Sequence, residues 1–277
     1  MLKKTKPTTS GTRHKLEVDR RDLHKGQPEK SLLISGHTKR QGRGFKGHIT
    51  VRHRGGGVKK RVRIIDWKRN KFGVPGRVDR IEYDPMRGAH LALVIYADGD
   101  KRYMIAPDDL KVNDQVMSGE KAEIKVGNAL PLRLIPVGLA IHNLEMRVGR
   151  GAQMVRGAGT AAYVQSKEKG FATIQMPSKE VRLIPEDCLA TIGQVGNSEW
   201  KNRKLGKAGR SRLMGIRPTV RGTAQQPNTH PHGGGEGRSG VGMKYPKTPW
   251  GKHALGTKTR NKKKPSNKYI IKDKRVK

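Results

Sequence analysis

Acidic side chains and cysteine are scarce in this chain of 277 residues. Only 23 Asp and Glu face 60 Lys and Arg, which leaves a formal net charge of +37. A single folded body repels itself at that charge, so the composition predicts a polyanionic partner. The one cysteine, Cys188, excludes a disulfide framework and a four-cysteine zinc site. We expect it to fill a core position, in a protein kept in a reducing compartment.

Long hydrophobic runs and aromatic residues are also missing. The longest uninterrupted apolar run, residues 91–97, is too short to cross a bilayer, and the first thirty residues hold no apolar stretch. We therefore expect no secretory signal, no membrane partner and a cytoplasmic location. The chain has only twelve aromatic side chains, too few for base stacking on an aromatic platform to be the main mode of recognition. We expect Arg, Lys and backbone amides to contact phosphates instead.

The positive charge lies mainly in the two ends of the chain. Residues 1–60 carry a net charge of +13 and residues 201–277 a net charge of +20, whereas residues 61–200 carry only +4. The central 140 residues are enough to bury a core. The basic ends have little apolar surface, so we expect them to be disordered alone and to fold on a phosphate backbone. The alternative is a solvated tail that only aids solubility.

The centre of the sequence predicts β-structure. Short apolar runs alternate with turn residues about every ten positions, and no helical periodicity of useful length is present. Only short helical turns are expected, for instance near residues 108–110 or 197–203. The first group of expected strands covers residues 49–51, 62–67, 78–83, 91–96 and 103–105. The second group covers residues 132–137, 161–165, 171–176, 181–184 and 189–192. This pattern predicts an all-β fold of two small barrels in tandem.

Two glycine-rich strings and a histidine pair suggest other kinds of site. The GxGxxG strings at 42–47 and 235–240 do not join a strand to a helix, so dinucleotide binding is not expected, and no P-loop string occurs. Zinc binding by His230 and His232 is disfavoured because Pro231 separates them and no cysteine lies nearby. We expect no metal and no cofactor. General-base catalysis by His230 lacks an orienting carboxylate, since Thr229 precedes it.

The glycine-rich segment around these histidines suits contact with phosphates. Gly233, Gly234 and Gly235 have no side chains, so their amides can approach RNA closely. Arg221 and Arg238 bracket the segment as phosphate anchors. The alternative is a mobile surface loop, and the sequence leaves the two interpretations nearly even.

The stretch from Arg221 to Arg238, with its string HPHGGGEGR, closely resembles the L-two family of large-subunit ribosomal proteins in its bacterial or organellar form. The similarity runs along essentially the whole chain. Further motifs that carry it are Ser35-Gly36, residues 52–57, residues 81–85 with Arg87, Val155-Arg156, residues 157–160, 215–218 and 248–251.

The resemblance implies an OB-fold barrel over residues 37–120 and an SH3-like barrel over residues 121–200. A basic extension is expected over residues 1–36, and a glycine-rich loop with a basic extension over residues 201–277. It also implies a non-enzymatic, primary rRNA-binding protein of the cytoplasmic or an organellar ribosome, which supports tRNA binding and the peptidyl-transferase region. The implied partners are large-subunit rRNA, small-subunit rRNA across the subunit interface and neighbouring ribosomal proteins.

The resemblance also points to individual residues. It implies that Arg87 and Arg156 contact rRNA, and we add Arg52 and Arg54 from the matching motif at residues 52–57. The histidine that corresponds to His230 has been proposed, with dispute, to take part in peptidyl transfer. An acidic residue commonly precedes that histidine, whereas this chain has Thr229. Direct catalysis by the His230 loop is therefore the weaker alternative, and a DNA-compacting basic protein is a third, based on charge alone.

Overall fold

The computed structural model describes residues 2–34 and 40–274, and the motif Ser35-Gly36 lies outside them. The chain forms two compact units. Unit 1 comprises Met1–Thr38, Lys59–Arg210 and Lys268–Lys277, and unit 2 comprises Lys39–Val58 and Ser211–Asn267. Each unit thus combines segments that are far apart in the sequence. The boundaries expected at residues 36, 120 and 200 remain a prediction.

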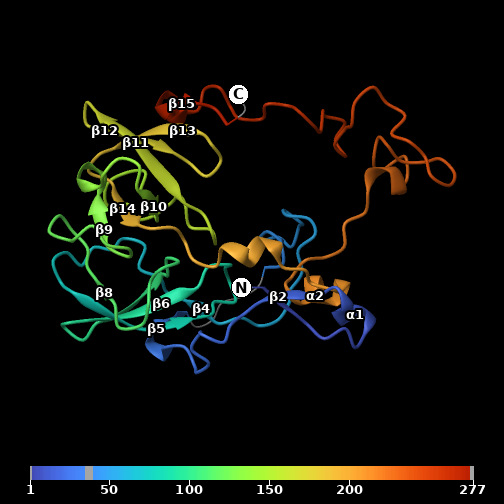
Figure 1. The fold of residues 1–277 in the computed structure, drawn as a ribbon. Helices are drawn as coiled ribbons and strands as arrows, with labels where there is room; N and C mark the ends of the chain where they lie inside the picture. Colours follow the sequence, from blue (N-terminus) through green and yellow to red (C-terminus); the bar gives the residue numbers. More distant parts are fainter. Residues whose placement is uncertain (1, 35–39, 275–277) are drawn as a thin grey trace. The chain divides into compact units, whose positions relative to one another are not determined.

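Unit 1 contains an antiparallel sheet with the strand order β7-β6-β5-β8 (Figure 1). Its strands are β5 (Gly76–Glu82), β6 (Leu91–Tyr96), β7 (Lys101–Ile105) and β8 (Gln115–Val116). The central strand β6 has the bounds that its apolar run predicts. Hydrophobic clusters cover both of its faces, which explains why the run is continuous and does not alternate.

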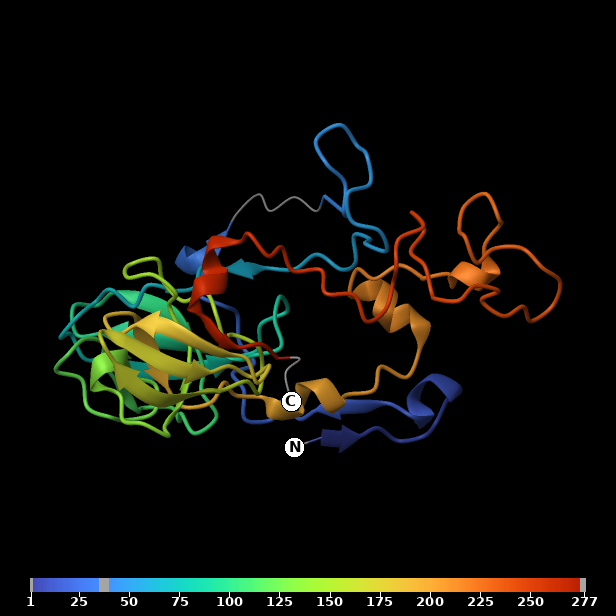
Figure 2. The same ribbon diagram turned by 90° about the horizontal axis from the view of Figure 1, so that it is seen from above.

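A second antiparallel sheet of unit 1 has seven strands in the order β15-β13-β12-β11-β10-β14-β9. Its strands are β9 (Ala129–Pro131), β10 (Ala140–His142), β11 (Ala162–Glu168), β12 (Phe171–Gln175), β13 (Val181–Pro185), β14 (Leu189–Ile192) and β15 (Ile270–Lys272). The last strand comes from the basic C-terminal end of the chain, which returns to pair with β13 (Figure 2). The ring of Tyr269 also lies 6.2 Å from the ring of Phe171.

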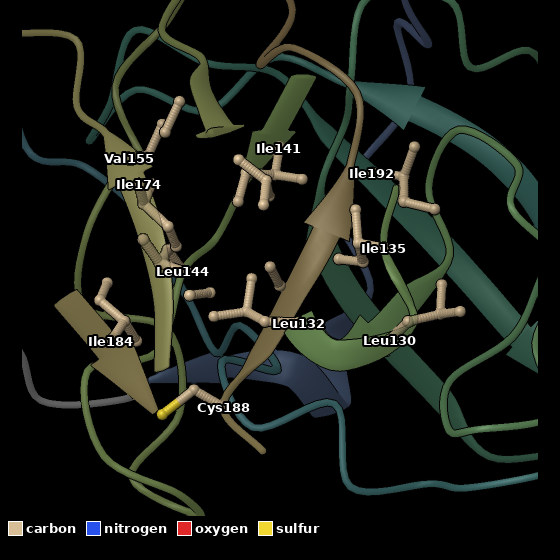
Figure 3. Packing of buried hydrophobic residues seen from close by; sticks show 14 of the residues in the cluster. Leu130, Leu132, Ile135, Ile141, Leu144, Val155, Ile174, Ile184, Cys188 and Ile192 are labelled. Carbon is tan, nitrogen blue, oxygen red and sulfur yellow. The ribbon is translucent and has the colours of Figure 1, made fainter. Parts of the chain in front are cut away.

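The core of this second sheet is the largest hydrophobic cluster of the described residues (Figure 3). Leu132, Ile141 and Ile174 are fully buried in it. Cys188 is a free, buried thiol in the same cluster, so its expected core position is confirmed. Burial raises the pKa of this thiol to about 12, and the charges of Glu145 and Asp187 act in the same direction. The thiol is therefore unreactive at neutral pH.

The remaining elements are short. Two-stranded pairs join β1 (Leu2–Lys4) to β2 (Leu16–Val18) and β3 (Leu33–Ile34) to β4 (Val62–Arg63). The helices are α1 (Ser10–Arg13), α2 (Ala208–Leu213) and the 3₁₀ helices η1 (Lys30–Leu32), η2 (Leu132–Leu134), η3 (Ser198–Asn202), η4 (Gly222–Ala224) and η5 (Pro265–Tyr269). The helical turn expected at 197–203 is confirmed by η3, whereas residues 108–110 form a turn and no helix.

Two of the expected strands are wrong. Residues 49–51 form no strand, and Ile49 and Val51 are 61% and 52% exposed, because unit 2 offers no hydrophobic layer against which a strand could pack. Residues 132–137 begin as the helix η2. Leu132 and Ile135 are both fully buried, and the tight 3₁₀ turn places residues three positions apart on one side. The apolar run thus reflects a buried turn.

Candidate nucleic-acid interface

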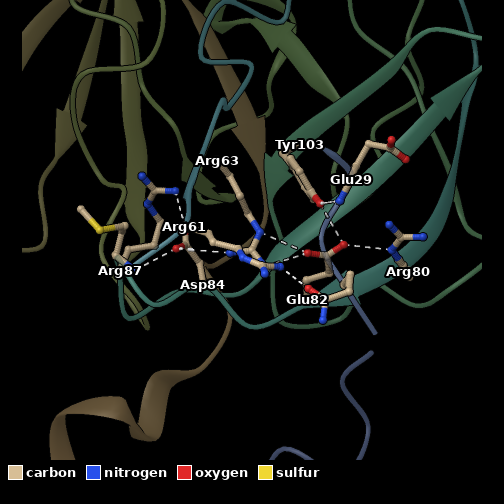
Figure 4. Close-up of polar contacts among 10 residues, drawn as sticks. Glu29, Arg61, Arg63, Arg80, Glu82, Asp84, Arg87 and Tyr103 are labelled. Carbon is tan, nitrogen blue, oxygen red and sulfur yellow. Dashed lines mark hydrogen bonds and ion pairs between the residues drawn. The ribbon is translucent and has the colours of Figure 1, made fainter. Parts of the chain in front are cut away.

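A buried network of charges lies at the end of β5 (Figure 4). Glu82 is 2% exposed and accepts hydrogen bonds from Arg63, whose Nε and Nη2 atoms lie 3.1 and 2.9 Å from Oε2. The Tyr103 hydroxyl and Arg80 Nε each donate to Oε1 over 2.9 Å. Hydrogen bonds and cations around this buried carboxylate replace the hydration that it loses on burial.

The turn after this strand holds Arg87. The Asp84 carboxylate, fully buried, accepts the Met86 amide over 2.8 Å and pairs with Arg87 Nη1 over 2.5 Å. Burial lowers the pKa of the Arg87 guanidinium; Asp84 opposes this shift, and the charges of Arg156 and Arg63 add to it. One predicted RNA-binding arginine thus lies among like charges, which a phosphate would offset.

A third buried carboxylate shapes the loop that carries Arg156. Glu145 is 2% exposed, and its two oxygens accept the amides of Gly151 over 2.7 Å and Leu189 over 3.0 Å. The Ala152 amide donates to the carbonyl of Trp67 over 2.7 Å. Gly151 has a φ of +77°, and a Cβ atom there would lie 2.9 Å from the same Trp67 carbonyl. Glycine is required at this close approach.

Trp67 brings the two predicted arginines together. The guanidinium carbon of Arg156 lies 4.6 Å from the centre of the Trp67 ring, and that of Arg87 lies 5.8 Å from it. Arg87 follows a strand of the first sheet, whereas Arg156 comes from a loop between strands of the second. Cation–π contact with one indole therefore orders two guanidinium groups from different parts of unit 1. Such a pair suits bidentate contacts with phosphate oxygens.

Other aromatic rings of unit 1 also carry arginines. Arg20 lies 3.7 Å from the Tyr83 ring centre, and Arg203 lies 3.5 Å from the Trp200 ring centre. Gly88 packs against Trp200 so closely that a Cβ atom would lie 2.6 Å from the indole. These rings position cations and are not open platforms for bases.

In unit 2, the glycine-rich segment with Arg52 and Arg54 runs antiparallel to residues 213–217. Arg54 pairs with Ile216, and the amides of Gly55 and Val58 donate to carbonyls of that segment over 2.9 Å. The other predicted residue, Arg52, places its guanidinium carbon 5.5 Å from the Trp250 ring centre. Both arginines therefore lie beside two backbone segments that are paired by hydrogen bonds. Glycines in these segments allow the two backbones to approach closely.

His230 is the buried centre of the glycine-rich loop. The residue is 7% exposed, and its Nδ1 atom accepts the backbone amide of His232 over 3.1 Å. An Nδ1 that accepts leaves the proton of a neutral imidazole on Nε2. His232 in turn accepts the Lys247 amide at its Nε2 over 2.8 Å. Gly222 packs against the same ring, where a Cβ atom would lie 2.4 Å from Cε1 of His230. The ring therefore organises the loop.

The predicted glycines are fixed by the same loop. A Cβ atom on Gly233 would lie 2.3 Å from the Gln226 carbonyl oxygen. Gly234 and Gly235 have φ values of +90° and +88°, which disfavour any other residue. Both Arg221, which precedes η4, and Arg238 are exposed. The loop thus presents backbone and two cations to solvent.

Comparison with known families identifies the chain. Residues 29–118 match Ribosomal Proteins L2, RNA binding N-terminal domain, and residues 125–251 match Ribosomal Proteins L2, C-terminal domain. The chain belongs to the ribosomal protein L2 family. It is a structural, RNA-binding constituent of the large ribosomal subunit, and its N-terminal domain binds RNA. The predicted all-β fold, OB-like and then SH3-like, is confirmed.

Within the L2 match, Arg52, Arg54 and Arg87 fall in the RNA-binding N-terminal domain. The C-terminal domain contains the three loop glycines and four further predicted residues, Arg156, Arg221, His230 and Arg238. In the part of the chain that the structure describes, no group of three His, Cys, Asp or Glu is placed to hold a metal ion. No helix there has the length and apolarity needed to span a membrane.

Sequence reasoning missed the residues that hold the L2 site together. Trp67 is one of only three tryptophans and lies in a basic segment, a signal that could have marked it. Glu82 and Asp84 lie in the family motif at residues 81–85. Their burial, and that of Glu145, could not be predicted, because a carboxylate in sequence does not show whether it is buried.

Proposed function

We propose that this L2-family chain is a primary rRNA-binding protein that supports subunit association, tRNA binding and the peptidyl-transferase region. Its barrels dock on large-subunit rRNA, and its basic segments penetrate the RNA. Small-subunit rRNA and neighbouring ribosomal proteins complete its partners in the cytoplasmic or an organellar ribosome. The proposed RNA-contacting residues are Arg52, Arg54, Arg87, Arg156, Arg221, His230, Gly233, Gly234, Gly235 and Arg238. The observation that carries this proposal is the pair of arginines at Trp67, since the positive charge of Arg156 acts on Arg87 and a phosphate would offset it.

Replacement of the two arginines tests this proposal. Arg87→Ala and Arg156→Ala should each lower the affinity for a large-subunit rRNA fragment. Each should also reduce the slope of log K against log salt by about 0.7–0.9, the value for one lost phosphate contact. Arg133→Ala is the matched control, because Arg133 is exposed in the same unit and pairs with Asp187 over 3.5 Å. Filter binding over a series of salt concentrations measures both quantities. Unchanged slopes in both variants would contradict the proposal.

Direct catalysis by the His230 loop is not favoured. The Nδ1 atom of His230 is occupied by the amide of His232, and no carboxylate precedes the ring in sequence. A role in positioning the loop is consistent with that contact. Ribosomes assembled with His230→Ala should retain the chemical step of peptidyl transfer, measured with a substrate that is already bound. A fall in that step with normal assembly would support the catalytic alternative.

A DNA-compacting function rests on charge alone. Duplex DNA should compete poorly with the rRNA fragment if contacts follow the shape of folded RNA. Competition at equal phosphate concentration tests this, and equal competition would favour the DNA alternative.

A further inference from the structure

Four hairpins in the described part of the chain close with the same turn. In each, the first residue donates its amide to the carbonyl of the fifth, and the fourth donates to the carbonyl of the first. These hydrogen bonds are 2.7–3.1 Å long, and the fourth residue has a φ between +66° and +83°. This is a type I turn followed by a left-handed residue. The turns span residues 44–48, 96–100, 176–180 and 248–252.

The residues at the tips of these turns differ between the two units. The second and third positions project farthest from the paired strands. In unit 1 they are Ala97-Asp98 and Pro177-Ser178, small or polar residues that suit a solvated tip. In unit 2 they are Phe45-Lys46 and Pro249-Trp250. Since the backbone turn is the same in all four, the fold does not require an aromatic residue at either tip.

Both aromatic tips lie in solvent. Phe45 is 91% exposed and Trp250 is 74% exposed, whereas Trp67 and Trp200 of unit 1 are half-buried. A cation accompanies each ring. Lys46 Nζ lies 5.6 Å from the Phe45 ring centre, and the Arg52 guanidinium carbon lies 5.5 Å from the Trp250 ring centre. Exposure of an aromatic ring to water is unfavourable, and this free energy is regained when a partner covers the ring.

The charge of unit 2 indicates what that partner is. Residues 39–58 and 211–267 contain 18 Lys and Arg but a single acidic residue, Glu236. Such a surface attracts nucleic acid and repels basic protein surfaces. A nucleotide supplies the flat face of its base for the aromatic ring and a phosphate for the neighbouring cation. We propose that Phe45 and Trp250 are stacking sites for unpaired nucleobases of the RNA, an inference that rests on the proposed function.

Stacking would give the hairpins a role that phosphate contacts alone cannot fill. Phosphates recur along every RNA strand, so cations alone do not fix the position of the protein along the RNA. An aromatic ring at a rigid tip binds where a base is unstacked, such as a bulge or a loop. The two hairpins therefore fix unit 2 to particular unpaired nucleotides, while the arginines and lysines supply the bulk of the affinity.

Substitution at the tips tests the proposal. Trp250→Leu and Phe45→Leu should each weaken binding of the full chain to large-subunit rRNA by about 5- to 150-fold, the range for loss of one stacked base. Trp250→Phe and Phe45→Tyr keep an aromatic face and should stay within about threefold of the original affinity. The slope of log K against log salt should not change, because no phosphate contact is lost. Equal affinities for the Leu and aromatic variants would overturn the proposal.

A matched control lies in unit 1. Ser178→Trp creates the pair Pro-Trp at the same turn positions as Pro249-Trp250, and it should not alter RNA affinity. Ultraviolet cross-linking of the complex, followed by mass spectrometry, should attach the peptide with Trp250 to a nucleotide. In assembled subunits, attachment to a neighbouring protein instead would overturn the proposal. If the original chain fails to bind rRNA, the proposed function fails; if it binds and the Leu variants bind equally, only stacking fails.

Discussion

Unit 1 and unit 2 are stabilised by different means. All members of the three hydrophobic clusters found among the described residues belong to unit 1, and its buried carboxylates Glu82, Asp84 and Glu145 are paired inside the protein. Unit 2 is built from backbone pairing, glycines at positive φ and one buried histidine, His230. Burial of apolar surface dominates folding free energy. Unit 1 therefore resembles an independent domain, whereas unit 2 resembles a segment that gains its stability from a ligand.

The largest expected effect follows from removal of a buried charge of unit 1, a kind of contact that, in the residues the structure describes, stabilises this unit and not unit 2. Glu82→Ala removes the closer carboxylate partner of buried Arg63 and leaves only Asp84, 3.8 Å away, so we expect a loss of about 3–5 kcal/mol in the free energy of unfolding. The matched control is Glu123→Ala, at an exposed pair with Lys125, where solvent screens the charges and the stability should hardly change. Urea unfolding followed by circular dichroism measures both. A loss below 1 kcal/mol for Glu82→Ala would show that water reaches Arg63.

Truncation of one leucine in each unit gives a sharper contrast. Leu132 is fully buried in the largest cluster, so Leu132→Ala should lower the free energy of unfolding by about 2–5 kcal/mol. Leu255 of unit 2 is 70% exposed, and Leu255→Ala should change it by less than about 0.5 kcal/mol. The same urea unfolding experiment compares them. Equal losses would mean that unit 2 has a core of its own.

The effect that is smallest per step of the measurement concerns pH and the interior of unit 1. Burial lowers the pKa of His142 to about 4, although a hydrogen bond with the Gly193 carbonyl opposes the shift. The unfolded state therefore binds the proton first. Stability is full above the unfolded pKa of about 6.5 and falls as the pH drops toward 4. The loss should approach about 1.4 kcal/mol per pH unit in that window.

His142→Gln should remove this part of the pH dependence while lowering stability at all pH values. The measurement is the free energy of unfolding between pH 7 and pH 4 for both proteins. Parallel curves for the two proteins would contradict the assignment to His142.

Much of the fold could be predicted because it follows from local patterns. The apolar runs at 91–96 and 189–192 predict β6 and β14 with the observed bounds. The edge strand β15 could not be predicted, since its few apolar residues form a strand only beside β13, about 90 residues away in sequence. The motifs also marked Arg87 and Arg156, but not Trp67 between them, because that contact depends on how the chain folds back on itself.

The amino-acid sequence by itself determined the excess of cations, the central β-strands, the glycines that allow close approach and the family motifs. Those features depend on composition and on neighbours along the chain. The tertiary structure decided which charges are buried, which arginines share a ring, and that four equal turns carry polar tips in one unit and aromatic tips in the other. Burial and contacts depend on residues that are distant in sequence, and a local sequence pattern does not show which distant residues meet in the folded chain.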